Sequence, residues 1–340
     1  MNKAAEKHET DNRKSRELLA RNGIDLHLHL DGSLPVETAK ELARLENIEL
    51  PDDEKLARAL KVPENCRDLN EYLTRFELPL MLLQSEKALE LAAYDLAEEL
   101  FAQGLCYAEI RFAPQLHLQK GLTQKSAAKA VMRGLGASKL QANAILCCMR
   151  GKNNLTENLE TVRVAEQLST GEGAGDICAL DIAGAEGLFP TELFGSLFAY
   201  MRASDIPFTL HAGEAAGPES VWKALEAGAS RIGHGVRSIE DPLLVKYLAA
   251  TGVPLELCPT SNLQTRVFER IEDFPLRKFM DAGLCVTVNT DNLTVSDTSL
   301  ANEFSLLKRT FSLNGAELDR LRANAAKAAF RRPLSYPLPS

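Results

Sequence analysis

Short apolar runs alternate along most of the chain with longer stretches whose apolar residues recur every three or four positions. The short runs have the length of buried strands, and the longer stretches have the spacing of amphipathic helices. Leu89, Ala93, Leu96 and Leu100 repeat at helical spacing, for example, and Gly104 follows as a helix-ending residue. The pattern predicts eight strands, near residues 24–29, 106–112, 144–149, 177–183, 208–211, 231–233, 253–258 and 284–289.

Helices are predicted between these strands and after the last one. They are expected near residues 35–47, 89–100, 124–141, 155–169, 190–203, 218–227, 241–250, 274–282, 299–312 and 316–330. Residues 50–85 are polar and irregular, but 69–84 is rich in Leu and Phe and predicts an inserted helical layer, a candidate lid. Eight strand–helix repeats are typical of a closed parallel barrel. We therefore expect an α/β fold, a (β/α)8 TIM barrel with extra helices between strands 1 and 2 and at the C-terminus.

Composition excludes several classes of partner. Among the 340 residues, 45% are apolar, which allows a large core; residues 23–332 are expected to form one barrel domain. A charged, flexible leader is expected at 1–22 and a Pro-rich tail at 333–340. The net charge of −8 and an aromatic content of 6% argue against nucleic acid or an anionic membrane as partner.

Cysteine usage and the lack of targeting signals predict a cytoplasmic protein. The seven Cys form no Cys-x-x-Cys pair and most lie in apolar runs, as expected in a reducing compartment. Cys147 and Cys148 are adjacent on a predicted strand, so they should face opposite sides; a redox role is the alternative. No apolar run approaches the ~20 residues of a membrane span, and the N-terminus lacks the apolar stretch of a secretion signal.

Two histidines end the first predicted strand. Because side chains alternate between the faces of a strand, His27 and His29 project to the same side, with Asp31 beyond them. Two imidazoles at this spacing can hold one metal ion. The alternative is that they are ordinary polar residues on a half-buried strand. The residues at the other strand ends discriminate between a metal site and this alternative.

Those ends carry more chemically active residues. They are Asp181 and Gly184 after the fourth strand, His211 and Glu214 after the fifth, His234 after the sixth, and Asp291 and Asn292 after the eighth. In a parallel barrel the carboxyl ends of the strands meet at one face, where active sites form. Four of the six histidines lie at that face, and chance placement would scatter them. The pattern therefore favours a metal site.

The predicted ligands are three imidazoles and one carboxylate: His27, His29, His211 and Asp291. Nitrogen and oxygen ligands of this kind suit Zn²⁺ with one position left for water, so one zinc ion per chain is expected. Bound zinc lowers the pKa of that water to about 7. Glu214 and His234 are the predicted catalytic residues: Glu214 protonates a substrate atom, and His234 orients the water or accepts its proton. Asp291 is a second candidate to orient the water.

Structural explanations compete for several of these residues. Glu214 is alternatively the start of the following helix, where a carboxylate is favoured, and His234 a packed turn residue. Asp181 is alternatively a structural cap, and His117 is interpreted as an ordinary loop residue. Glu109 and Arg111 share one strand face, and we expect them to pair inside the barrel as a structural feature.

The sequence resembles the adenosine deaminase family of metal-dependent hydrolases. The resemblance is carried by His27-Leu-His-Leu-Asp-Gly-Ser33, Asp181-Ile-Ala-Gly184, His211-Ala-Gly-Glu214, Arg231-Ile-Gly-His-Gly235, Cys258-Pro-Thr-Ser-Asn262, Asn289-Thr-Asp-Asn292 and Asn324-Ala-Ala-Lys-Ala-Ala-Phe330. These segments follow the order in the family and cover about residues 24–330. The resemblance implies zinc-dependent hydrolysis of adenosine, and of 2'-deoxyadenosine, to the 6-oxo product and ammonia, in purine metabolism.

The resemblance also implies individual roles. Glu214 matches the residue that protonates purine N1, His234 the residue that handles the attacking water, and Gly184 the backbone donor to N3. Asp31 matches a residue that contacts the ribose, and His29 is expected to contact the substrate as well as the metal. Relatives that act on adenine or aminodeoxyfutalosine tend to carry Glu at the position of Asp31, so the Asp indicates a nucleoside; those two substrates are the alternative.

One position departs from the pattern of many members. Where they carry Asp bonded to purine N7, this chain has Asn292. Because N7 is an acceptor and an amide NH₂ donates without needing an added proton, Asn292 is predicted to bind N7 too. A two-metal site is disfavoured because the fourth strand end carries no Lys. A cytidine-type site is disfavoured because neither His-x-Glu nor Pro-Cys-x-x-Cys is present. A nucleoside-binding protein without catalysis is the remaining alternative.

Overall fold

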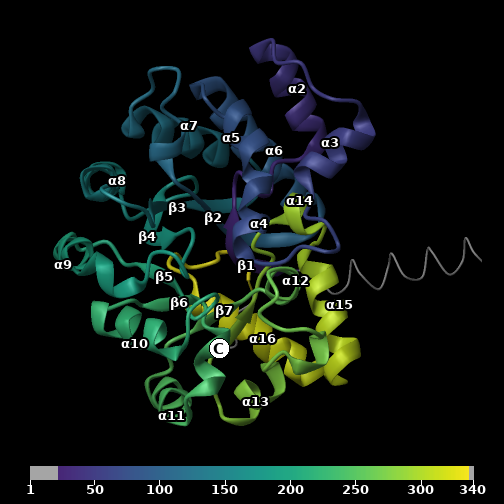
Figure 1. Ribbon diagram of the computed structural model, residues 1–340, viewed down its shortest axis with the longest axis vertical. Helices are drawn as coiled ribbons and strands as arrows, with labels where there is room; N and C mark the ends of the chain where they lie inside the picture. The colour runs from purple at the N-terminus through teal and green to yellow at the C-terminus, as the bar shows by residue number, and fades with distance from the viewer. Residues whose placement is uncertain (1–21, 337–340) are drawn as a thin grey trace, which may run out of the picture.

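A ring of parallel strands lies at the centre of the computed structural model, which describes residues 22–336, with helices around it (Figure 1). The strands are β1 (Gly23–His29), β2 (Leu105–Phe112), β3 (Gln141–Met149), β4 (Ile177–Ala183), β5 (Thr209–Ala212), β6 (Arg231–His234), β7 (Leu255–Leu257) and β8 (Val286–Val288). All eight predicted strands are present, which confirms the alternation read from the sequence. The largest error is at β3, which begins three residues before the predicted start of residue 144.

The strands form two four-stranded parallel sheets, β1-β2-β3-β4 and β5-β6-β7-β8. Two further parallel bridges join the sheets at both edges. At one edge Leu28 pairs with Asp291, where His29 N donates to Asp291 O at 2.7 Å; at the other Leu180 pairs with Phe208. These bridges close the sheets into the predicted barrel.

The helices are those expected between the strands, with additions. They are α2 (Val36–Glu46), α3 (Asp53–Leu60), α4 (Leu69–Leu73), η1 (Thr74–Phe76), α5 (Glu77–Leu82), α6 (Glu86–Ala102), η2 (Pro114–Leu116), α7 (Gln124–Ala137), α8 (Leu155–Leu168), η3 (Thr191–Phe194), α9 (Gly195–Ala203), α10 (Pro218–Ala227), η4 (Val236–Glu240), α11 (Pro242–Thr251), α12 (Pro259–Gln264), η5 (Ile271–Asp273), α13 (Leu276–Asp281), α14 (Leu293–Ser296), α15 (Leu300–Phe311) and α16 (Gly315–Ala328). The extra helices between β1 and β2 and at the C-terminus are confirmed.

Local chemistry explains where several helices begin and end. The Ser85 side chain accepts a hydrogen bond from Ala88 N and caps α6, so this helix begins three residues before the first predicted repeat position. The prediction of a helix to residue 141 was wrong, because α7 ends at Ala137 and β3 begins at Gln141. The irregular assignment of 50–85 was also too coarse: α3 forms there, with Asp52 as its cap and Leu56 and Leu60 buried.

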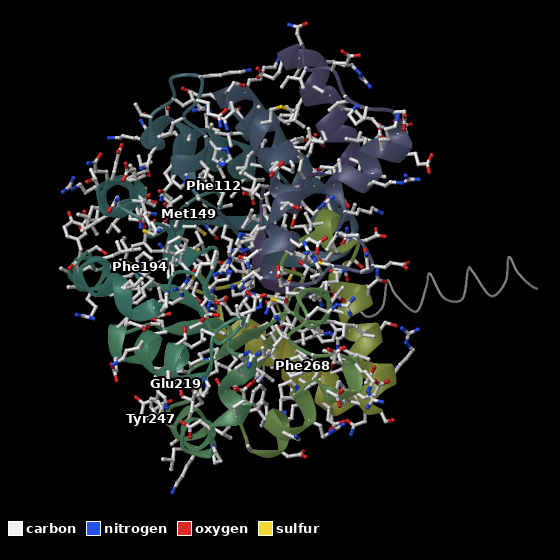
Figure 2. All side chains as sticks on the ribbon, in the orientation of Figure 1. Phe112, Met149, Phe194, Glu219, Tyr247 and Phe268 are labelled. Carbon is white, nitrogen blue, oxygen red and sulfur yellow. The ribbon has the colours of Figure 1, made fainter. Side chains whose placement is uncertain are left out.

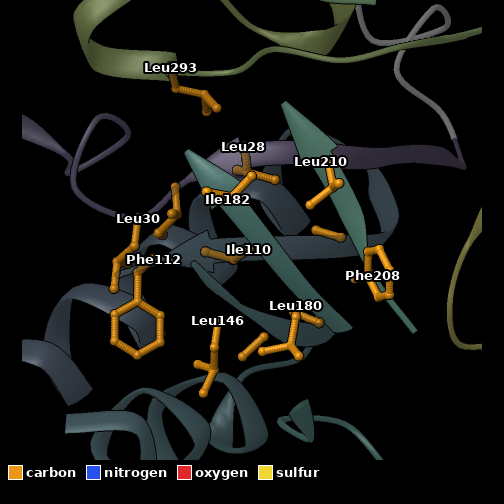
Figure 3. Close-up of a cluster of buried hydrophobic side chains, with 14 of the residues drawn as sticks. Leu28, Leu30, Ile110, Phe112, Leu146, Leu180, Ile182, Phe208, Leu210 and Leu293 are labelled. Carbon is orange, nitrogen blue, oxygen red and sulfur yellow. The ribbon is translucent and has the colours of Figure 1, made fainter. Parts of the chain in front are cut away.

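The outward faces of the strands form the apolar core. Leu28, Ile110, Leu146, Leu180 and Leu210 are fully buried and gather between the strands and the surrounding helices (Figure 3). Each is the sequence neighbour of a residue that points into the barrel. The same alternation therefore places the chemically active side chains of β1 and β5 inside the ring.

The barrel interior is charged rather than apolar, and here one prediction was wrong. Glu109 and Arg111 do not pair with each other. Arg231 lies 2.6 Å from Glu109, and Arg111 lies 2.8 Å from Asp181 and 2.9 Å from Glu256. Residues on one strand face are two positions apart along the strand, whereas long arginine side chains reach across the ring. All five side chains are buried, so each charge has a partner, as burial requires.

The ends of the chain complete the comparison. The predicted leader at 1–22 lies outside the described residues except for Asn22, and residues 337–340 of the predicted tail also lie outside them.

Cys147 lies 3.8 Å from Asp181 inside the barrel, whereas Cys148 Sγ donates outward to Asn158 O, so the two thiols face opposite sides as predicted. Between residues 22 and 336, no helix combines the length and apolarity that crossing a bilayer requires.

Candidate active site

Three imidazoles and a carboxylate converge at the carboxyl end of the barrel. His29 Nε2 lies 3.3 Å from His211 Nε2, and Asp291 Oδ1 lies 3.4 Å from His29 Nε2 and 3.6 Å from His27 Nε2. One ring nitrogen from each of His27, His29 and His211 lies within 4.8 Å of the other two. The structure thus brings together the four residues predicted as ligands.

The donor set fits a tetrahedral metal ion. Two ligand atoms ~2.0–2.1 Å from a tetrahedral zinc lie roughly 3.3 Å apart, close to the observed spacings. In addition, His27 Nε2 is buried and has no hydrogen-bond partner among the described residues. A buried polar atom of this kind normally has a partner, and a metal ion would supply one. A second group, His27, His234 and Cys258, overlaps this one but lacks the carboxylate.

Buried carboxylates orient two of these imidazoles. Glu256 Oε2 lies 2.7 Å from His27 Nδ1, and Asp181 Oδ2 lies 2.8 Å from His211 Nδ1. A carboxylate on the second ring nitrogen fixes the tautomer that leaves Nε2 free for a metal. Asp181 is therefore not a simple cap, because its carboxylate contacts a predicted ligand. The sequence analysis did not identify Glu256, because it is a single Glu in an apolar strand and forms no motif with another polar residue at a recognisable spacing.

Burial sets the protonation state of the first two histidines. It lowers the pKa of His27 and of His29 well below the usual range, and the neighbouring cations act in the same direction. Neutral imidazoles keep the lone pair that a metal requires. For His211, burial also lowers the pKa, but the Asp181 carboxylate outweighs it and raises the pKa overall.

Glu214 and His234 lie side by side next to this cluster. Glu214 belongs to the loop between β5 and α10, which begins at Pro218, so it does not start the helix. Its Oε2 lies 3.6 Å from His234 Nε2, and its Oε1 accepts a hydrogen bond from the Thr265 hydroxyl at 3.4 Å. Burial and the Asp291 charge raise the pKa of Glu214 to about 8. The raised pKa favours the protonated form of its carboxyl group, which is able to donate a hydrogen bond.

His234 has an unusual backbone and a specific partner. It ends β6 with φ of 58°, and Asp291 has φ of 62°; both are in the left-handed region that non-glycine residues seldom adopt. Such conformations concentrate at functional sites. The Asn262 Nδ2 atom lies 3.1 Å from His234 Nδ1, and burial lowers the pKa of His234 to about 4. Asn262 ends the Cys258–Asn262 segment that resembles the family, but the sequence did not indicate its contact with His234.

A cavity of about 320 Å³ opens beside these groups. This is within the range of small-molecule sites, roughly 300–1,000 Å³. Its walls include His29, Asp31, Gly184, His211, Glu214, His234, Asp291 and Asn292, together with apolar residues such as Met149, which ends β3 and is labelled in Figure 2. Every predicted site residue except His27 therefore lines it, and His27 lies behind. A hollow of about 530 Å³ at the opposite end of the strands contains none of them.

Asn292 is fixed by the inserted helical layer. Its Nδ2 donates to the Tyr72 hydroxyl at 3.0 Å, and that hydroxyl lies 2.6 Å from Ser296 Oγ. Gly32 makes room for the amide, because a Cβ atom there would lie 1.7 Å from Asn292 Oδ1. Tyr72, from α4, is a second residue that the sequence did not single out. His117 is buried with Nδ1 2.7 Å from Leu83 O, away from the cavity.

Comparisons with known proteins agree with this geometry. The adenosine deaminase family model matches residues 23–333. The adenosine deaminase of Haemophilus ducreyi is 49% identical, over 90% of this chain and 91% of its own, and that of Enterococcus faecalis is 39% identical, over 91% and 92%. The crystal structure of an adenine deaminase from Arthrobacter aurescens superposes with a TM-score of 0.82 at 27% identity, covering 91% of this chain and 93% of that one. The chain belongs to the adenosine deaminase family.

Proposed function

We propose that this chain hydrolyses adenosine, and 2'-deoxyadenosine by the same contacts, to inosine or deoxyinosine and ammonia in purine salvage. Family membership over residues 23–333 and relatives of that name at up to 49% identity support this activity. The single observation that carries it is the meeting of the His27–His29–His211–Asp291 cluster with Glu214 and His234 at one cavity. Purely binding proteins have no need of that combination.

The proposed cofactor is one Zn²⁺ per chain, held by the three imidazoles and the Asp291 carboxylate. Bound there, Zn²⁺ would lower the pKa of a water ligand toward about 7. The convergence of their Nε2 and Oδ1 atoms supports this assignment, as does His27 Nε2, which has no hydrogen-bond partner within the described part of the chain. The Glu256 and Asp181 carboxylates keep two of these imidazoles, those of His27 and His211, in the required tautomer.

Glu214 is the proposed proton donor to purine N1. Its raised pKa favours the protonated form, and its position on the cavity wall brings it to the edge of a bound base. As the water oxygen forms a bond to C6, the proton moves from Glu214 to N1, which makes C6 electrophilic. The C6–N6 bond then breaks: one proton of the water completes the leaving ammonia, and the other passes from the C6 hydroxyl back to Glu214 as the 6-oxo group forms.

His234 and Asp291 are proposed to position the attacking water. If the Asn262 amide donates to Nδ1, the neutral His234 ring keeps its proton on Nε2, on the side that faces Glu214. In that form the ring donates a hydrogen bond to oxygen instead of accepting a proton. This favours the orienting role over the base role for His234, and leaves Asp291 as the group that accepts or directs the proton.

The substrate contacts are proposals from the same geometry. Gly184 directly follows β4 on the cavity wall and is assigned the backbone contact to N3; Asp31 is assigned the ribose hydroxyl, and His29 a contact with the substrate. Asn292 is assigned N7. One N–H of its amide is donated to Tyr72, and the second N–H is left for the base. The unpaired cysteines of the chain suit the cytoplasm, which we propose as its location.

The test is direct. Adenosine added to the purified enzyme should lose ultraviolet absorbance as inosine forms, with one ammonia released per inosine. Glu214→Gln should lower kcat by about 100-fold or more, because general acid catalysis contributes typically 10²–10⁴-fold. Tight adenosine binding without ammonia release by the zinc-loaded wild-type enzyme would refute the proposal.

Adenine is the second candidate substrate, because the adenine deaminase of Arthrobacter aurescens shares the fold at 27% identity. The higher identity to adenosine deaminases and the short Asp31 side chain favour the nucleoside. Steady-state kinetics with adenosine, deoxyadenosine, adenine and aminodeoxyfutalosine should give the largest kcat/KM for the first two. A larger value for adenine or aminodeoxyfutalosine would reassign the substrate.

A further inference from the structure

Glu186 is a buried carboxylate that none of the roles above uses. It lies just after Gly184, between β4 and η3, is 1% exposed and does not line the cavity. Its two oxygens accept hydrogen bonds from four consecutive main-chain N–H groups in the loop that carries Glu214. The donors are Gly213 N at 2.8 Å, Glu214 N at 3.1 Å, Ala215 N at 2.8 Å and Ala216 N at 2.9 Å. The Ser220 hydroxyl is a fifth donor.

The carbonyl groups of the same loop are bound from other elements. The Arg150 guanidinium donates to His211 O at 2.7 Å, while Arg237 donates through its main-chain N to Gly213 O at 3.0 Å and through Nε to Glu214 O at 3.1 Å. By contrast, the one hydrogen bond that the Glu214 side chain makes within residues 22–336 is the 3.4 Å contact from Thr265. The position of the Glu214 carboxyl group is therefore set by its main chain, and the N–H half of that main chain is bound by Glu186.

We propose that Glu186 is a positioning residue for the reaction: it holds loop 213–216 so that the Glu214 carboxyl group meets the substrate at the correct distance. This inference rests on the proposed role of Glu214. A carboxylate is required because it offers acceptors only. A glutamine would place an NH₂ group where an oxygen now accepts, so at least one loop N–H would lose its partner.

Glu186→Gln tests this, with Asp176→Asn as the matched control. Asp176 lies at the other end of β4, is also buried, and accepts from Thr170 N and Gly171 N at 2.9 Å each. Each variant exchanges a carboxylate that binds a loop main chain for an amide, but only Glu186 binds the loop of Glu214. Melting temperature and zinc content are measured for both, and kcat is expressed per zinc-loaded chain.

We expect Glu186→Gln to lower kcat by about 100-fold, the order that a 1 Å misplacement of a catalytic group produces, with KM and zinc content near wild type. Amides 213–216 should exchange hydrogen faster in this variant. Asp176→Asn should keep kcat and speed exchange only at residues 170 and 171. Retained kcat in Glu186→Gln, or a loss that only follows lost zinc or lost folded protein, would overturn the inference.

The exchange measurement separates this inference from the proposed function. If the wild-type enzyme did not deaminate adenosine, the proposed function would be rejected. The hold of Glu186 on the loop would then be rejected separately, by amides 213–216 that exchange hydrogen at the same rate in Glu186→Gln as in the wild type. If wild-type enzyme were active and Glu186→Gln equally so, only the role of Glu186 would be rejected.

Discussion

His234 and Asp291 adopt left-handed backbone conformations within one small site, and each aims a polar side chain at the cavity. Conformations of this kind cost of order 1–3 kcal/mol each, and surrounding contacts must enforce them. For Asp291 those contacts are the two hydrogen bonds with β1, from Asp291 N to His27 O and from His29 N to Asp291 O. The segment that pairs with β1 and closes the barrel thus also carries Asp291, a predicted metal ligand.

Asn292, the next residue, gives a prediction at the same scale. Asn292→Ala removes the donor assigned to N7 and also leaves the Tyr72 hydroxyl without it, so kcat/KM for adenosine should fall by about 10–100-fold. Asn292→Asp should lose much less, because a protonated carboxyl group can still donate. Steady-state kinetics give kcat/KM for adenosine in both variants. Equal decreases in the two variants would show that Asn292 does not bind N7.

At the scale of elements, α15 is linked to the segment that carries Asn262. Glu303 of α15 is fully buried and accepts hydrogen bonds from Thr260 N at 3.1 Å and from the Thr298 hydroxyl. Burial raises its pKa from 4.5 to about 7. Between those values the folded state binds the proton more tightly than the unfolded state, so this group lowers the free energy of unfolding as pH rises from about 4.5 to 7.

Glu303→Gln should remove that pH-dependent loss while keeping an acceptor for Thr260 N. Its free energy of unfolding relative to wild type should therefore rise between pH 5 and pH 8, by on the order of 1–3 kcal/mol. Urea unfolding of both proteins at the two pH values measures this difference. A difference that stays constant, or that falls toward pH 8, would show that Glu303 is charged in the folded protein at neutral pH.

Element order was predictable from the sequence because it depends on local periodicity. Strand and helix patterns repeat eight times, and parallel strands bring their carboxyl ends together, so His27, His211 and Asp291 could be grouped without coordinates. Glu256 and Glu186 could not be found in this way. Each acts through groups remote in sequence, such as His27 for Glu256 and four main-chain amides for Glu186, and a main-chain donor leaves no mark in the sequence.

Element boundaries were less predictable, for a related reason. Helix α3 begins in a charged segment, where only Leu56 and Leu60 mark the buried face, and its packing against the inserted layer decides its structure. Tyr72 lies in the segment predicted as an inserted helical layer, and the sequence pattern did not indicate that its hydroxyl contacts Asn292. The expected Glu109–Arg111 pair was wrong because closing the barrel brings Arg231 and Glu256 closer to them than they are to each other.

For the whole molecule, the closed ring explains how one short segment from each of several strands makes a single site. Arg111 contacts both Asp181 and Glu256, and those carboxylates contact His211 and His27 respectively. The charged interior thus connects the predicted ligands to one another across the barrel. Truncating one buried partner leaves an uncompensated charge, so the fold and the proposed metal site should fail together.

The central claim is that Zn²⁺ in this cluster is required for adenosine hydrolysis. The most direct measurement is the rate of absorbance loss with adenosine for enzyme stripped by a chelator and dialysed, before and after one equivalent of Zn²⁺ is added. We predict that stripped enzyme loses nearly all activity, that zinc restores it, and that His211→Ala neither binds zinc tightly nor recovers. Full turnover by enzyme with no measurable metal would contradict the account.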